Sequence, residues 1–226
     1  MTHISDSAFN GCINLETLSL VEGLEIIDSN AFSNCKKLKE IVIPNSVTRI
    51  GYGAFSECVG LEKIIIPFAS SKESEYGVIS FNSIFSRTAN VKEIIINGGS
   101  EIDDNAFMYF NNLKSITIPL SITRIGENAF SGSYELTDVY YKGTITDWAK
   151  IEFSTLYSNP MVGAEHFNIL TETNEYYEVT EIEIPSIGLN EEVYTMDSML
   201  NDVNQHVQIL EPSNLDKHFI LLAAHS

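Results

Sequence analysis

The stretch that decides the fold is residues 38–60, which read LKEIVIPNSVTRIGYGAFSECVG; residues 113–135 repeat it as LKSITIPLSITRIGENAFSGSYE. In both, apolar residues recur 0, 3, 5, 9 and 12 positions after the first leucine, Ala-Phe follows at 16 and 17, and a small residue at 20. A pattern that recurs at fixed positions is typical of a structural repeat, in which each unit buries its apolar residues against its neighbours. The sequence therefore predicts a repeat protein.

Two landmarks give the period of this repeat independently. The phenylalanines are spaced by 23, 23, 30, 22 and 23 residues, and they are Phe9, Phe32, Phe55, Phe85, Phe107 and Phe130. The residues that start each unit give the same series, and they are Leu15, Leu38, Leu61, Val91, Leu113 and Leu136. The agreement predicts coils of about 23 residues, with an insertion of about seven residues within 68–81.

Each unit also contains a short alternation of inward and outward positions, which is the period of a half-buried strand. Ile41 and Ile43 are predicted to point inward, and Glu40 and Val42 outward. The equivalent inward pairs are Leu18/Leu20, Ile64/Ile66, Ile94/Ile96, Ile116/Ile118 and Val139/Tyr141. Proline ends three of these strands because it cannot donate to a sheet: Pro44, Pro67 and Pro119. Stacked strands of this kind predict a solenoid with a parallel sheet on one face.

Composition and charge exclude several classes of partner. The 226 residues hold 13 Lys and Arg against 31 Asp and Glu, a net charge of -18, which repels nucleic acid and anionic membrane surfaces. No apolar run is long enough to span a bilayer, and the first residues lack the features of a secretion signal. Because Met1 falls in the middle of a repeat, we expect a fragment of a longer protein.

The three cysteines occupy the same position of successive repeats, where later repeats have Thr88, Phe110 or Ser133. A position that accepts such different side chains does not suit a metal ligand or a fixed disulfide. We therefore expect Cys12, Cys35 and Cys58 to be small buried residues. Neither a metal nor a cofactor is expected.

The motif of residues 43–61, IPNSVTRIGYGAFSECVGL, resembles the BspA-like class of bacterial leucine-rich repeats, as does its copy in residues 118–136. The resemblance covers residues 1–170, because 139–153 and 158–170 are similar to the segment that closes such arrays. It implies a β-rich leucine-rich-repeat solenoid over residues 1–140 and a capping segment over 141–170. It further implies a bacterial cell-surface or extracellular protein whose repeats bind protein or cell-surface ligands or act as spacers.

The residues of the capping segment support this interpretation. Thr146 is the predicted N-cap of a short helix, with Asp147 in its first turn and Trp148 and Ile151 against the last coil. Further residues expected to cover that end are Tyr141, Phe153, Phe167 and Ile169. Glu165 and His166 could form a metal pair, but no third ligand stands at a recognisable spacing.

The outward positions of the strands are the candidate binding site. One row of them reads Ser19, Val42, Ile65, Ile95, Thr117 and Tyr140, and a charged row beside it reads Glu40, Lys63 and Glu93. The aliphatic part of the first row suits a protein partner, and the insertion could extend the contact. The alternative is that β-branched residues stand here only because they suit strands.

Residues after 170 follow another pattern. We expect an acidic linker over 171–183 and an incomplete β module over 184–226. Residues 182–194, 198–210 and 218–226 resemble the first part of a sortase, a cysteine transpeptidase with a β-barrel fold. The resemblance implies that His225 is the catalytic histidine. The nucleophilic cysteine and the arginine of that family would lie further on, so this chain is not expected to be catalytically active, and a sorting-signal peptide would bind only to a completed module.

Two functions therefore stay open. The first is a surface protein that binds partners through its repeats. The second is a sortase that carries repeats in a longer chain, and a downstream cysteine in a TLxTC-like motif, followed by an arginine, would distinguish it from the first.

Overall fold

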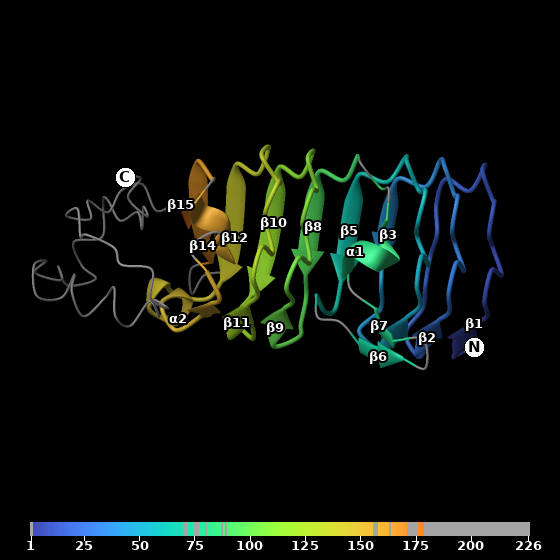
Figure 1. Ribbon diagram of the computed structural model, residues 1–226, viewed down its shortest axis with the longest axis horizontal. Helices are drawn as coiled ribbons and strands as arrows, with labels where there is room; N and C mark the ends of the chain where they lie inside the picture. Colours follow the sequence, from blue (N-terminus) through green and yellow to red (C-terminus); the bar gives the residue numbers. More distant parts are fainter. Residues whose placement is uncertain are drawn as a thin grey trace, which may run out of the picture.

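The alternating segments of the repeats form the long strands of the protein. The computed structural model describes residues 2–69, 72–74, 77–79, 81–86, 88, 90–155, 158–162, 164–170 and 176–178. One seven-stranded sheet runs along the molecule, with its strands in the order β15-β14-β12-β10-β8-β5-β3 (Figure 1). Its strands are β3 (Glu40–Val42), β5 (Lys63–Ile66), β8 (Glu93–Ile96), β10 (Ser115–Pro119), β12 (Asp138–Lys142), β14 (His166–Leu170) and β15 (Tyr176–Glu178). We call it the long sheet.

The register of the long sheet reproduces the repeat period. Its strands from β3 to β14 are parallel, and the residues that begin β3 to β12 pair in one line, namely Glu40, Lys63, Glu93, Ser115 and Asp138. The steps along this line are 23, 30, 22 and 23 residues. The predicted inward residues Ile41 and Ile43 are buried, and Glu40 and Val42 are exposed. The prediction of a β-rich fold with a parallel sheet is confirmed.

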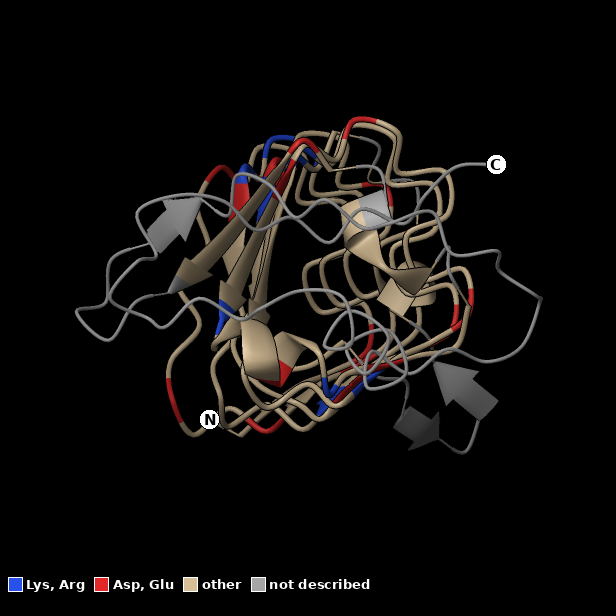
Figure 2. Ribbon diagram, turned by 90° about the vertical axis from the view of Figure 1, so that its left-hand side faces the viewer, with Lys and Arg blue, Asp and Glu red and all other residues tan. Residues whose placement is uncertain are grey.

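A second set of strands, which the sequence did not predict, forms on the other side of each repeat. These two-residue strands make two parallel sheets, β1-β2-β4 and β13-β11-β9. They are β1 (His3–Ile4), β2 (Ile26–Ile27), β4 (Arg49–Ile50), β9 (Glu101–Ile102), β11 (Arg124–Ile125) and β13 (Glu152–Phe153). Figure 2 shows the long sheet along one side and the turns opposite it, so that each repeat surrounds a common interior.

The interior is filled by the recurring apolar residues, with the phenylalanines as its most regular part. The rings of Phe9, Phe32, Phe55 and Phe85 stack with centroids 5.1, 5.3 and 5.4 Å apart. Phe107 and Phe130 continue the row at 5.3 Å. Because these rings contact the rings of neighbouring repeats, the core is shared by neighbours and no repeat could bury its apolar surface alone.

The insertion lies on the side of the short strands, away from the exposed face of the long sheet. After β5 the chain forms the antiparallel pair β6 (Lys72–Ser74) and β7 (Gly77–Ile79), which Figure 1 shows near β2. The short helix α1 (Phe81–Ile84) follows and replaces the usual turn. Phe81 contacts both Phe85 and Phe107, at centroid distances of 4.8 and 4.7 Å, and so joins the two parts of the ring row.

The predicted capping segment adds strands to both layers. Helix α2 (Ile145–Trp148) is followed by β13, which pairs with β11, the 3-10 helix η2 (Pro160–Val162) and β14, which pairs with β12. Trp148 and Ile151 are buried as predicted, and so are Tyr141, Phe153, Phe167 and Ile169. The N-cap is Thr144, and the prediction of Thr146 was wrong. Residues 176–178 of the predicted linker form β15, antiparallel to β14.

The first repeat departs from the predicted pattern in the burial of its residues. Leu18 and Leu20, predicted to be inward strand residues, lie outside any strand and are only half-buried. Phe9 is 44% exposed, whereas Phe32 in the next repeat is 0% exposed. Cys12 is exposed as well, which corrects the expectation that all three cysteines are buried.

Candidate binding face of the long sheet

The structure brings the predicted apolar positions together in one row. Val42 pairs with Ile65, Ile65 with Ile95, and Ile95 with Thr117, each on the neighbouring parallel strand. Their inward neighbours Ile41, Ile64 and Ile94 are each 0% exposed, so the strand alternation directs this row outward. Val42 is 44% exposed, and Ile65 and Ile95 are half-buried. We call Val42, Ile65 and Ile95 the apolar row.

Two charged rows lie beside the apolar row, towards the start of the strands. In one, Lys63 stands between its register partners Glu40 and Glu93, and its Nζ lies 2.9 Å from Glu93 Oε2. In the other, the Nζ atoms of Lys39 and Lys92 donate to Glu62 Oε1 and Oε2 at 3.0 and 2.8 Å. The hydrogen bonds from Lys92 and Lys39 lower the pKa of Glu62 to about 2. Glu62 is therefore ionised at neutral pH and ion-paired to both lysines.

Tyr140 continues the apolar row on β12. It pairs with Thr117 on one side and Asn168 on the other. Burial raises the pKa of Tyr140, and the nearby carboxylates of Asp138 and Glu93 raise it further, so its hydroxyl stays protonated at neutral pH. All seven binding residues predicted from the sequence thus lie on one face. His225 lies outside the described residues.

The short strands carry an ion-pair network that was not predicted from the sequence. Arg49 Nη2 donates to Asp28 Oδ1 at 2.7 Å, and His3 Nε2 contacts the other oxygen of Asp28. In the second half of the chain, Arg124 contacts Glu101 and Asp104 at 3.7 and 3.2 Å. The repeated Arg-Ile-Gly of the motif, with an aspartate one repeat earlier, was the available signal. These pairs join neighbouring repeats.

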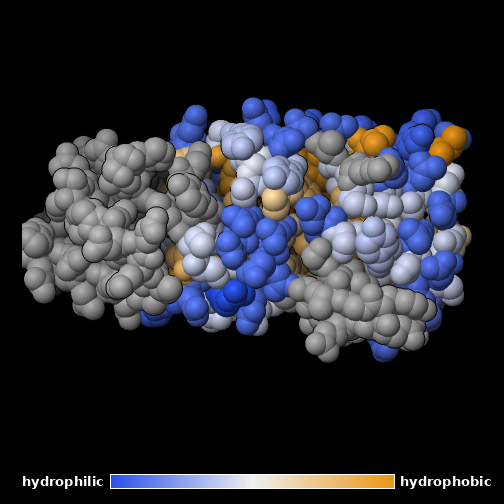
Figure 3. All heavy atoms as spheres, viewed as in Figure 1, coloured by the Kyte–Doolittle hydropathy of each residue, from blue (hydrophilic) through white to orange (hydrophobic). Residues whose placement is uncertain are grey.

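The side of the molecule opposite the long sheet is mainly hydrophilic. Figure 3, viewed from the side on which α1 lies, shows scattered hydrophobic atoms at the upper edge. The exposed apolar and aromatic residues outside the long sheet include Tyr52, Val59, Tyr109 and Tyr134. They come from separate turns and form no row like that of the strands.

The His, Cys, Asp and Glu side chains of the described residues do not gather into a metal site. Within them, no group of three or more His, Cys, Asp or Glu side chains could hold a metal ion. Burial raises the pKa of the Cys58 thiol to about 12 and also raises that of Cys35. The Cys58 thiol donates to the carbonyl of Phe32 at 3.2 Å. These two thiols are therefore protonated at neutral pH and unsuited to nucleophilic attack. No helix in the described part of the chain is long and apolar enough to cross a membrane.

Sequence comparison identifies one family. A profile described as BspA type leucine-rich repeat region, in six copies, matches residues 2–136 and, in an overlapping match, residues 78–199. The comparison with curated proteins gives no match.

Three solved structures are similar to parts of this chain. A leucine-rich cell surface protein from Faecalibacterium prausnitzii A2-165 is 32% identical, with 58% of this chain and 33% of that chain covered and a TM-score of 0.44. The leucine-rich repeat protein of T. pallidum is 24% identical, covering 54% and 56%, with a TM-score of 0.35. One from Bacteroides ovatus ATCC 8483 is 17% identical, covering 69% and 71%, with a TM-score of 0.22. The matched part spans about a third of the F. prausnitzii chain.

Proposed function

Because the chain belongs to the BspA-type leucine-rich repeat family, we propose that it is part of a bacterial cell-surface or extracellular protein that binds a protein partner on the exposed face of its long sheet. The observation that carries the proposal is the apolar row, three aliphatic side chains in register on neighbouring strands and bordered by two charged rows. The proposal includes adhesion as the role of this binding, and a continuous solenoid as its scaffold.

The apolar row and the charged rows are expected to contribute differently to binding. Aliphatic side chains that are exposed in one patch lose their contact with water when a partner covers them, which favours association. The charged rows are held by their own ion pairs and are better suited to orienting a partner than to supplying affinity. The seven residues of the proposed site are Glu40, Val42, Lys63, Ile65, Glu93, Ile95 and Tyr140.

The test replaces the apolar row. Substituting Val42, Ile65 and Ile95 together by Ser should reduce binding to immobilised extracellular-matrix and cell-surface proteins, measured by surface plasmon resonance, by about tenfold or more. The matched control replaces Tyr52, Val59 and Tyr134 by Ser, because these side chains are also exposed but lie outside the long sheet. Equal losses in both triple variants, or none in the first, would reject this face. Circular dichroism verifies that both variants are folded.

A repeat-bearing sortase is the second candidate. It is favoured by the ordered sequence similarity of residues 182–194, 198–210 and 218–226, all outside the described residues. In this proposal the repeats of residues 1–140 and the capping segment 141–170 position a sortase module near its substrates. Residues 184–226 are the first part of that module. The test is whether the gene encodes a TLxTC-like cysteine and an arginine downstream. If so, the full product should join a sorting-signal peptide to an amine, and His225→Ala should abolish that reaction.

A further inference from the structure

The charged row that contains Lys39, Glu62 and Lys92 changes character at the next strand. From Lys39 to Lys92 the signs alternate, and Glu62 bonds to both lysines. The next residue in the row is Lys114, whose backbone N–H donates to the carbonyl of Lys92 at 2.8 Å. Two lysines therefore stand side by side on neighbouring strands.

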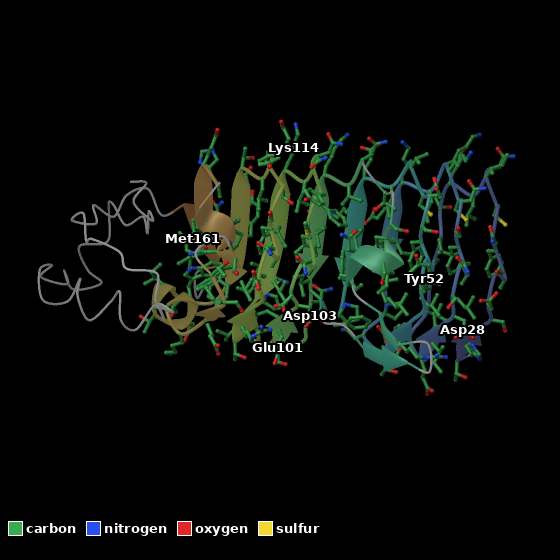
Figure 4. All side chains as sticks on the ribbon, in the orientation of Figure 1. Asp28, Tyr52, Glu101, Asp103, Lys114 and Met161 are labelled. Atoms are coloured by element: carbon green, nitrogen blue, oxygen red, sulfur yellow. The ribbon has the colours of Figure 1, made fainter. Side chains whose placement is uncertain are left out.

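The two lysines of this pair differ in their carboxylate partners. Lys92 shares Glu62 with Lys39, each bonded to one of its oxygens, whereas Lys114 is exposed without an ion-pair partner among the residues that the structure describes. Figure 4 labels Lys114 at the upper edge of the long sheet, where its side chain points into solvent. Like charges on adjacent strands repel, so an anionic group brought between them would be attracted by both.

The lysine pair is close enough to the apolar row for one partner to reach both. Lys92 precedes Ile95 by three residues on one extended strand, a distance of roughly 10 Å. Lys114 has the same relation to Thr117, which pairs with Ile95. The row that contains Lys39, Lys92 and Lys114 has one carboxylate, Glu62, whereas the row beside it has Lys63 against Glu40, Glu93 and Asp138. The lysine row is thus locally basic on a chain with a charge of -18.

We infer that the partner on this face is an acidic polypeptide segment with apolar side chains. Its aliphatic or aromatic residues pack on the apolar row, and one of its Asp or Glu carboxylates accepts hydrogen bonds from the ammonium groups of Lys92 and Lys114. The inference rests on the proposed function, since it names the chemistry of the partner for the same face. A polypeptide is favoured over an acidic polysaccharide because only the former supplies apolar groups for Val42, Ile65 and Ile95.

The experiment is a selection from a random twelve-residue peptide library displayed on phage, carried out on the full chain. On the wild type we expect enriched peptides that combine apolar residues with Asp or Glu. Synthetic copies should bind about fivefold more weakly to Lys114→Glu, which replaces attraction by repulsion. A separate selection on Lys114→Glu should enrich Lys or Arg. The control Lys36→Glu makes the same charge change at an exposed lysine before β3 and should bind as the wild type does.

The outcomes separate the two proposals. The inference of an acidic partner is rejected if the enriched peptides depend on the apolar row but lack acidic residues. It is also rejected if they bind Lys114→Glu as tightly as the wild type. Both outcomes remain consistent with the proposed binding face. Peptides that bind equally well to the Val42, Ile65 and Ile95 triple Ser variant overturn the face itself. Peptide binding to the single variant Val42→Ser is measured in the same way, as a substitution that disturbs the fold less. Heparin binding that is stronger than peptide binding and insensitive to the triple variant also overturns the inference.

Discussion

The phenylalanine of each repeat shows how one residue type joins neighbouring repeats. Phe55 has a ring stacked on each side, from Phe32 and Phe85, whereas Phe9 has only Phe32 and is 44% exposed. The same side chain in the same motif therefore has two environments. Its contribution to stability depends on how many neighbours cover it, which the motif alone does not state.

We predict that Phe55→Ala lowers the free energy of unfolding by about 3–5 kcal/mol, because it leaves a cavity between two rings. Phe9→Ala should cost clearly less, since part of that ring already faces water. Urea denaturation followed by circular dichroism measures both. Equal losses for the two variants would contradict the view that the ring row is uncovered at Phe9.

Glycine and asparagine fix the turns in a way that also depends on neighbouring repeats. A Cβ on Gly51 would lie 2.3 Å from the backbone nitrogen of Ser29 in the preceding repeat. On either side of Ala31 and Phe32, Asn30 and Asn34 adopt φ values of 53° and 62°, a region that favours Asn and Gly. The spacing of the motif thus reflects close contact between turns as well as the burial of apolar residues.

At the scale of elements, helix α2 shows why a short helix can form where it does. The Thr144 side chain accepts a hydrogen bond from the Asp147 backbone N–H, and the Asp147 carboxylate accepts one from the Thr144 backbone N–H, at 3.2 Å each. The hydrogen bond from the Thr144 hydroxyl is the largest cause that lowers the pKa of Asp147 to about 2, and Lys150 contributes next. The N-cap predicted from the sequence, Thr146, lies two residues after the observed one.

Thr144→Ala should therefore destabilise the protein by about 0.5–2 kcal/mol, whereas Thr146→Ala should change its stability by less than about 0.5 kcal/mol. Both variants are measured by thermal denaturation. The reverse order would show that Thr146 is the cap after all.

The low pKa of Asp147 also predicts a dependence on pH. Its folded value of about 2 is below the ordinary 3.8, so the folded state favours the carboxylate. The stabilisation is complete above about pH 4 and is lost as the pH falls towards 2. Carbon NMR titration should show the Asp147 pKa moving up in Thr144→Ala, and an unchanged pKa would contradict the role of the hydroxyl.

For the whole molecule, ion pairs run along both layers of strands. The long sheet carries alternating lysine and glutamate rows, and the short strands carry the Asp28 and Arg124 networks (Figure 2). The chain has 31 Asp and Glu against 13 Lys and Arg, so its acids cannot all be paired with bases. Repulsion among them opposes the folded state at low ionic strength.

Raising NaCl from about 0.02 M to about 0.15 M should therefore increase the Tm by about 2–4 °C at pH 7, because salt screens this repulsion. Differential scanning calorimetry provides the measurement. The effect should shrink near pH 4.5, the pI given by the sequence. A decrease in Tm at pH 7 would mean that the ion-pair rows outweigh the repulsion.

The sequence by itself determined the repeat period, the inward and outward positions of the strands, the site of the insertion and the residues of the apolar row. These follow from spacing within one unit, where the alternation of a strand and the burial of Phe55 or Ile41 act locally. Only the tertiary structure decided that Arg49 meets Asp28, that Lys92 stands beside Lys114, and that Phe9 is uncovered while Phe32 is not. Such contacts join residues about 20 or more positions apart, so they exist only once the repeats lie side by side.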